Sequence, residues 1–149
     1  MSTRPLLNKA VPDAYKTTIA LSEQAEKAAL DAGVEPLAIE LVRIRASQIN
    51  GCGYCLRMHV RDALAKGETT DRIAVLPAWR ETGYFSPAER AALAIAEEIT
   101  HIDTRMAGVD DETAAVTDQQ AAALRWVAIS INAFNRVSIA SAHPPRRRR

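Results

Sequence analysis

Both cysteines of this 149-residue chain and one of its three histidines lie within eight residues of one another. The stretch reads INGCGYCLRMH and places Cys52, Cys55 and His59 at spacings of three and four residues. Side chains at these spacings share one face of a helix. Two thiols placed in this way can approach closely enough to form a disulfide, and a neighbouring imidazole can accept a thiol proton. The stretch is therefore a candidate site for redox or acid–base chemistry.

Two local effects favour different cysteines as the thiolate. Cys52 stands in the expected first turn of a helix, where free backbone N–H groups and the helix macrodipole stabilise negative charge. Cys55 stands four residues before His59, so the imidazole can reach its sulfur. These local effects leave open which of the two thiols attacks first.

Glu40 is the candidate for the third group that usually orients a base acting on a thiol. It falls on an apolar helical stripe that includes Leu37 and Ile44, which is an unusual place for a carboxylate. At roughly 1.5 Å per residue, Glu40 lies about 16 Å before a turn at Gly51 and His59 lies about 12 Å after it. In a helical hairpin the two side chains can therefore meet directly or through one water.

Other interpretations of these residues stay open. Free cysteines pack well as small hydrophobic residues, and Glu40 can form an ion pair with Arg43 or Arg45. A structural zinc site needs four ligands, whereas the chain has no second cysteine pair, and His101 and His143 have no ligand-like spacing. We therefore expect no metal. The joint placement of two thiols, an imidazole and a carboxylate on facing stripes favours redox chemistry.

The bulk composition is that of an ordinary globular protein. Hydrophobic residues make up 48% of the chain and charged residues 25%, and the length suits one domain over residues 1–149. The formal net charge is +1, and removing the four arginines at 146–149 leaves the body at 1 − 4 = −3. Such a body is unsuited to binding nucleic acid. We interpret residues 143–149 as a solvated, disordered Pro/Arg tail.

The cellular setting follows from what the sequence lacks. No apolar run is long enough to span a bilayer, and the N-terminal residues lack the apolar region of a secretory signal. We therefore expect a cytoplasmic protein without a membrane partner. In a reducing compartment two cysteines do not make a structural disulfide framework, so the CxxC is a redox pair, part of a metal site, or chance.

Helices are the elements expected to position these groups. Sustained period-two alternation is missing, whereas helix start and stop signals are frequent. The pattern predicts helices over 13–32, 36–50, from about 52 to 67, 71 to about 80, 87 to about 100, and 118 to about 140. Residues 101–116 are expected to be looser, with room for one short helix. The second and third helices should form a tight hairpin about residues 50–51, because Gly51 can end the second helix.

Several single residues mark these boundaries. Ser86 and Thr117 each begin a capping box, Thr70 is the expected cap of the 71–80 helix, and Pro77 should bend that helix or end it early. Asn132 and Asn135 are polar within an apolar run of the last helix. We expect them to hydrogen bond across helices or across a subunit contact.

The motif resembles that of the AhpD-like alkylhydroperoxidases, within the wider carboxymuconolactone decarboxylase family. The core of the resemblance is residues 40–52, ELVRIRASQINGC, continuing through Cys55 to His59. The shared pattern is a glutamate twelve residues before the first cysteine, then CxxC, then a histidine four residues after the second cysteine. The likeness continues through residues 78–82, 85–93 and 131–136, so it covers most of the chain from about 35 to 140.

The resemblance implies an all-α domain with the CxxC at the start of the third helix and subunits packed as a homo-oligomer, a trimer or hexamer. It also implies a thiol-dependent peroxidase that needs neither metal nor organic cofactor. In that scheme Cys55 attacks an organic hydroperoxide and Cys52 then closes the redox-active disulfide. His59 and Glu40 relay the proton, and a dithiol protein or small thiol reduces the disulfide.

Tyr54 is the position at which the chain departs from the best-studied alkylhydroperoxidase type, which has a second histidine just before the second cysteine. A free phenol titrates near pH 10, so it is a poor base at neutral pH, although it can donate a hydrogen bond. Tyr54 is therefore an auxiliary candidate. Two alternatives stay open: a cofactor-free acid–base enzyme of the carboxymuconolactone decarboxylase type, and a non-enzymatic redox-sensing helical module.

Overall fold

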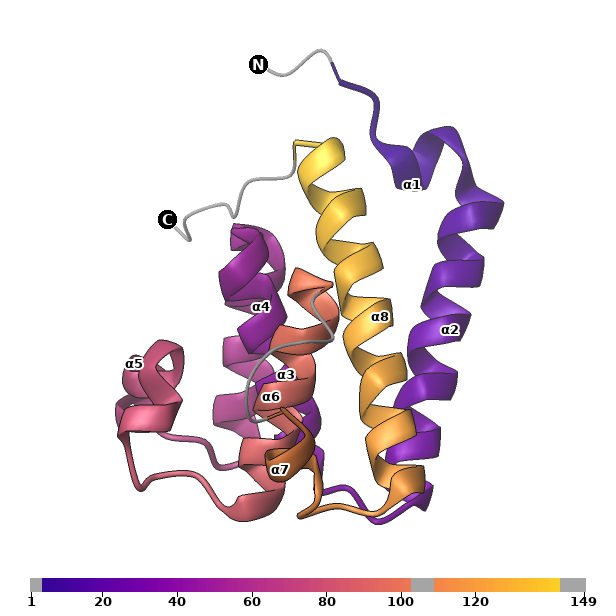
Figure 1. Ribbon diagram of the computed structural model, residues 1–149. Coiled ribbons are helices and arrows are strands. Elements are labelled where there is room, and N and C mark those ends of the chain that lie inside the picture. The colour runs from indigo at the N-terminus through magenta and orange to yellow at the C-terminus, as the bar shows by residue number, and fades with distance from the viewer. Residues whose placement is uncertain (1–3, 103–108, 143–149) are drawn as a thin grey trace.

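The computed structural model describes residues 4–102 and 109–142, and every regular element in these two ranges is a helix (Figure 1). The all-α prediction is confirmed for this part of the chain, and the predicted 143–149 tail lies outside it. None of the described helices combines the length and the hydropathy needed to cross a membrane. The elements are α1 (Leu7–Ala10), α2 (Pro12–Asp31), α3 (Pro36–Asn50), α4 (Gly53–Ala65), α5 (Thr70–Val75), the 3-10 helix η1 (Leu76–Glu81), α6 (Pro87–His101), α7 (Val109–Thr113) and α8 (Asp118–Ala140).

Local start and stop signals set most of the helix boundaries. α3 has the predicted bounds, and α2 begins one residue early because Pro12 fits the first helical position. Both predicted capping boxes are present: the Ser86 and Thr117 side chains accept hydrogen bonds from the backbone N–H groups three residues on, at 3.2 and 3.1 Å. One short helix, α7, lies within the 101–116 stretch, as expected.

Two sequence predictions need correction. α1 was not predicted, because four residues are too few to show helical periodicity, so the CxxC begins the fourth helix and not the third. The predicted 71–80 helix is two elements: α5 ends at Val75 and η1 begins at Leu76, with Pro77 in its first turn, so the early end expected at Pro77 is confirmed. A non-helical φ of −115° at Ala78 adds a kink inside η1. Its cap is Thr69 and not Thr70, since the Thr69 side chain accepts a hydrogen bond from the Arg72 N–H at 3.3 Å.

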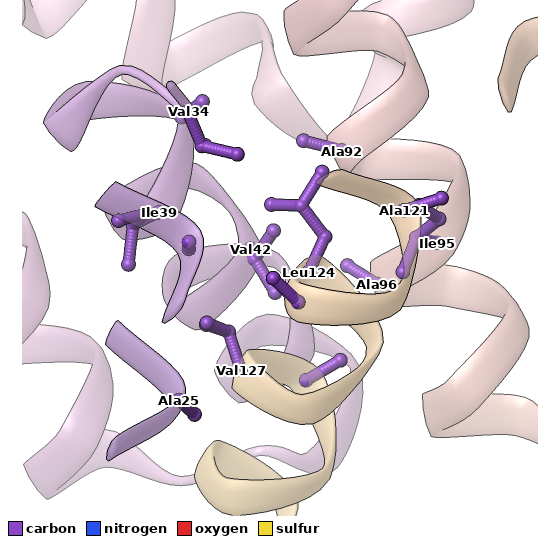
Figure 2. Packing of buried hydrophobic residues seen from close by; sticks show 14 residues of the cluster. Ala25, Val34, Ile39, Val42, Ala92, Ile95, Ala96, Ala121, Leu124 and Val127 are labelled. Atoms are coloured by element: carbon purple, nitrogen blue, oxygen red, sulfur yellow. The ribbon is translucent and has the colours of Figure 1, made fainter. Parts of the chain in front are cut away.

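A four-helix core supports the site. α8 packs along α2, α3 and α6, and α3 also packs against α4 and α6. Figure 2 shows Val42 of α3 and Leu124 and Val127 of α8 meeting small side chains of α6 and α2, such as Ala96 and Ala25. Alanine at these contacts lets helix axes approach closely, which gives a rigid frame with little side-chain freedom.

The predicted hairpin of α3 and α4 turns at Gly51. Gly51 has φ +67° and ψ +30°, the left-handed conformation that ends a helix at low cost only for glycine. The Cys52 N–H then donates to the Ser47 carbonyl at 3.0 Å, which closes the turn. This turn places Cys52 as the N-cap of α4 and directs α4 back along α3.

An asparagine network ties this turn to α8. The Asn50 side-chain amide donates to Asn132 at 2.8 Å and to Asn135 at 2.9 Å. Asn135 in turn donates to the Ser47 hydroxyl at 3.0 Å. The expected cross-helix bonding of both asparagines is therefore confirmed within one chain, and the end of the hairpin is fixed against the last helix.

The conformation of Gly51 predicts a measurable cost of substitution. A Cβ added at Gly51 meets no atom within 4 Å, so only the left-handed backbone is strained. We expect Gly51→Ala to lower the free energy of unfolding by about 1–2 kcal/mol in urea denaturation. Gly83→Ala is the matched control, because Gly83 also has open space around it and has no positive φ. Equal stability of the two variants would contradict the assignment.

Candidate active site

The two thiols lie at the start of α4 and are shielded from solvent. Cys52 is 1% exposed and Cys55 is 3% exposed, and both are free thiols. The Cys52 sulfur accepts a hydrogen bond from the Cys55 backbone N–H at 3.4 Å, so this sulfur is itself the side-chain cap of α4. Ala46 and Ile131 belong to the same buried apolar cluster as the two thiols.

The predicted contact between Glu40 and His59 is direct. His59 Nδ1 lies 3.0 Å from Glu40 Oε2, and both side chains are buried. With the proton on Nδ1, the ring donates to the carboxylate and leaves Nε2 as a proton acceptor. The hairpin therefore brings together a base and the group that orients it.

Two cations complete the surroundings of the Glu40 carboxylate. Lys66 Nζ donates to Glu40 Oε1 at 2.6 Å, and Arg43 Nη1 donates to the same oxygen at 3.0 Å. Burial of Glu40 raises the pKa of its carboxyl, but the hydrogen bonds from His59 and Lys66 and the charge of Arg43 outweigh it and lower the pKa from 4.5 to about 2. Glu40 is thus a carboxylate throughout the neutral range.

The pKa of the Cys55 thiol shifts in the opposite direction to that of Glu40. Burial raises the pKa of the Cys55 thiol most, and the neighbouring Cys52 raises it further, whereas contacts with Asn135 and Ser138 lower it. The net effect raises the pKa of Cys55 to about 12. Burial thus opposes the thiolate that a nearby histidine would favour at this position. Cys55 is a protonated thiol at neutral pH and needs a base when it reacts.

An apolar cavity of about 330 Å³ lies beside the thiol. Cys55 and His59 line it from α4, and of the two thiols only Cys55 does so. Within the described residues no hydrogen bond joins the His59 ring to the Cys55 sulfur, although both side chains line one cavity. The Tyr15 and Phe134 rings meet edge to face at a centroid distance of 6.1 Å and close the wall between α2 and α8.

Cations at the cavity are compensated by carboxylates. Arg43 lines the cavity, but its guanidinium donates to Glu40 at 3.0 Å and to Glu26 at 2.7 Å. Among the described lining residues no other Lys or Arg is present. The cavity therefore offers an uncharged, largely apolar ligand a better match than an anion.

Tyr54 lies at the rim of the cavity. Its side chain is 48% exposed, and it also lines a neighbouring groove with Arg57 and Arg61. A half-exposed phenol at the entrance can contact a ligand as it enters.

Lys66 and Ser138 are site residues that the sequence analysis did not identify. Lys66 seemed to lie off the apolar stripe, yet it stands seven residues after His59, which is nearly two helical turns, so both reach Glu40. That spacing was the available signal. Ser138 carries no comparable signal, because its approach to Cys55 depends on how α8 packs against α4.

A metal site is disfavoured by the charges around Glu40. Glu40, His59 and Asp62 bring three potential ligand atoms within 4.8 Å of one another. Glu40 Oε1, however, already accepts hydrogen bonds from two cations, and a metal ion would have to compete with both. These residues fit an ion-paired proton relay better than a metal centre.

Comparisons with known proteins agree with this geometry. The model of the carboxymuconolactone decarboxylase family matches residues 12–98. The chain is 34% identical over 145 residues to the uncharacterized protein YdfG of Bacillus subtilis, covering 94% of this chain and 95% of that protein. A shorter stretch of 41 residues is 44% identical to the alkyl hydroperoxide reductase AhpD of Rhodospirillum centenum, covering 28% of this chain and 22% of that one.

A solved structure shares the fold. It is the crystal structure of an Agrobacterium tumefaciens protein of unknown function, provisionally described as an antioxidant defence protein AhpD. The superposition has a TM-score of 0.83 at 29% identity and covers 98% of this chain and all of the other.

The pKa of Glu40 predicts an acid-sensitive contribution to stability. The unfolded chain binds a proton at this residue near pH 4.5, whereas the folded chain keeps it ionised down to about pH 2. Between these values the unfolded state binds more protons, so stability falls as the pH falls. From pH 5 to pH 3 we expect the wild type to lose about 2 kcal/mol more than Glu40→Gln in urea unfolding.

The exposed Glu23 of α2 provides the control for this measurement. Glu23→Gln should keep the pH dependence of the wild type. If Glu40→Gln also keeps it, the carboxylate is not held ionised by its three partners.

Proposed function

The chain belongs to the carboxymuconolactone decarboxylase family, and we propose that it is an AhpD-like thiol peroxidase that reduces organic hydroperoxides through Cys55 and Cys52. The observation that carries the proposal is the position of Cys55: of the two thiols it alone lines the apolar cavity, and it shares that cavity with His59. A hydroperoxide in the cavity would meet one thiol, with one base beside it. Cys52 does not line the cavity, and its sulfur accepts a hydrogen bond from the Cys55 backbone N–H.

In the first step His59 Nε2 takes the proton of the Cys55 thiol, and the sulfur attacks the terminal oxygen of the hydroperoxide. The O–O bond breaks, Cys55 becomes a sulfenic acid, and the leaving alkoxide receives a proton from His59 to give the alcohol. The raised pKa of Cys55 makes the base necessary, because very little thiolate is present at neutral pH. Glu40 stabilises the transient imidazolium through its contact with Nδ1.

In the second step Cys52 attacks the sulfenic sulfur of Cys55. A disulfide forms, and the proton of the Cys52 thiol leaves with the sulfenic hydroxyl as water. A dithiol, either a protein or a small molecule, then reopens the disulfide by exchange and carries away the two electrons. The net reaction converts one hydroperoxide and one dithiol into one alcohol, one water and one disulfide.

The acid–base alternative within the family is less well matched to this cavity. A carboxylated lactone is an anion, and its recognition needs a free cation. The one arginine among the described lining residues is neutralised by Glu26 and Glu40. An uncharged hydroperoxide makes no such demand, so the charge balance of the site favours the peroxidase.

Oxidation of the reduced protein tests the proposal directly. One equivalent of cumene hydroperoxide should remove two hydrogens from the intact mass of the wild type, and added dithiothreitol should give sustained peroxide consumption. Cys52→Ser should accumulate a sulfenic acid that dimedone traps at Cys55, and Cys55→Ser should be inactive. Full turnover in Cys55→Ser would contradict the assignment. A single oxidation without turnover in the wild type would indicate a redox sensor.

The relay predicts a slower reaction when Glu40 loses its charge. Glu40→Gln should lower the rate of peroxide reduction roughly 10²-fold, because His59 loses the group that orients it and stabilises its charge. Glu97→Gln is the matched control: Glu97 is also buried and accepts hydrogen bonds from Arg45 and Trp79, but it has no contact with His59. Equal losses in the two variants would point to general destabilisation and not to a relay.

A further inference from the structure

We propose that Arg57 and Arg61 of α4 bind the carboxylate of a fatty-acid hydroperoxide. In this arrangement the apolar chain of the substrate lies over Tyr54 and Met58, and its reacting end enters the cavity at Cys55. The chemistry at that end rests on the function proposed above. Recognition of the carboxylate concerns binding alone, and it can be measured without any peroxide chemistry.

A second hollow lies beside the cavity. It is a groove of about 280 Å³ along α4, and it is lined by Tyr54, Arg57, Met58, Arg61 and Asp62. Tyr54 and Met58 also line the cavity, so the two hollows meet at these side chains. A ligand that fills the cavity and extends past them therefore enters the groove.

Arg57 and Arg61 bring uncompensated positive charge to this groove. Both are exposed, and neither forms a hydrogen bond or an ion pair through its side chain within residues 4–102 and 109–142. Other arginines of the described helices donate to carboxylates, as Arg43, Arg72 and Arg125 do. Two like charges four residues apart on a helix repel each other, so an anion bound between them relieves the repulsion and gains charge-assisted hydrogen bonds.

Asp62 is the acidic residue of the groove, and it does not cancel this charge. Its carboxylate lies 3.9 Å from His59 Nδ1, which places it toward the cavity side of α4. Two cations and one carboxylate leave the groove with a net positive charge. The groove therefore favours an anionic group, whereas the cavity next to it favours an uncharged one.

The path from the thiol to the groove sets the length of the ligand. Arg61 follows Cys55 by six residues, which is about 9 Å along the helix axis and, by the shorter way, about 120° around it. Tyr54 and Met58 lie on this shorter way. On a helix surface with a radius of about 5.5 Å the path is about 15 Å long. Helical side chains lean toward the N-terminus, which shortens the path for a residue as long as arginine.

An apolar chain matches the surface between these two ends. Tyr54 is 48% exposed and Met58 is 41% exposed, so two large side chains with apolar surface stand uncovered at the rim of the cavity. A fatty acid has an uncharged body and carries its carboxylate at one end, as this arrangement requires. A compact carboxylated lactone does not fit, because its carboxylate cannot lie so far from its reacting ring.

Binding of unreactive hydroxy acids tests this proposal. The probes are 12-hydroxydodecanoic acid, 6-hydroxyhexanoic acid and the amide of each, titrated calorimetrically into the reduced full-length protein. An extended chain advances about 1.2 Å per bond, so the long probes cover about 13 Å and the short probes about 6 Å. We expect the wild type to bind the long acid about 5-fold more tightly than the long amide, and to show no such preference within the short pair.

Variants of α4 locate this preference. The double variant Arg57→Gln, Arg61→Gln should abolish it and still fold, because both residues are exposed and glutamine is a good helix former. Lys9→Gln should keep it, since Lys9 is an exposed cation that lines neither hollow. Equal binding of the long acid and the long amide, an equal preference within the short pair, or a preference that survives the double variant would each overturn the proposal.

The corresponding hydroperoxides separate this inference from the proposed function. If the wild type reduces 12-hydroperoxydodecanoic acid and its amide, kcat/KM should favour the acid, and the double variant should lose this preference. If it reduces neither but the hydroxy probes keep their order of binding, the peroxidase assignment fails while the carboxylate site stands. If both are reduced at equal rates and the hydroxy probes bind equally, the carboxylate site fails while the peroxidase assignment stands.

Discussion

The buried carboxylate of Glu40 is the constraint on which the rest of the site depends. A charge removed from water must be compensated, and here the partners come from both arms of the hairpin: Arg43 from α3, and His59 and Lys66 from α4 and its C-cap. Because one carboxylate contacts all three, it fixes the register of α4 along α3. The same contacts that orient the imidazole therefore also hold the two helices in place.

This arrangement divides the site into a charged side and an apolar side. Glu40 is buried between helices, and its partners Arg43 and His59 reach one side of the cavity, whereas Phe134 and Ile131 form an apolar wall around Cys55. The division explains why two pKa values in one site shift in opposite directions: compensation by its partners lowers the pKa of Glu40, and burial raises the pKa of Cys55. A thiol kept protonated in this way resists adventitious oxidation until a base acts on it.

Local sequence signals predicted the parts of the structure that depend on local interactions. The Gly51 turn and the two capping boxes are set by neighbouring residues, and the Glu40–His59 contact followed from counting residues on either side of Gly51. The raised pKa of Cys55 could not be predicted from the sequence, because it depends on burial between packed helices, which no local pattern describes. The cavity needs five separate segments to converge, so the sequence alone could not indicate it.

The sulfur cap of α4 links oxidation to the integrity of the helix. The Cys52 sulfur accepts the Cys55 N–H while it is a free thiol, and a bond between the two sulfurs would change the geometry of that contact. Whatever stability the cap contributes then belongs to the reduced form. Stabilising the dithiol raises the reduction potential of the pair, as it does in strongly oxidising thiol proteins. The first turn of α4 thus helps to set how readily the pair accepts electrons.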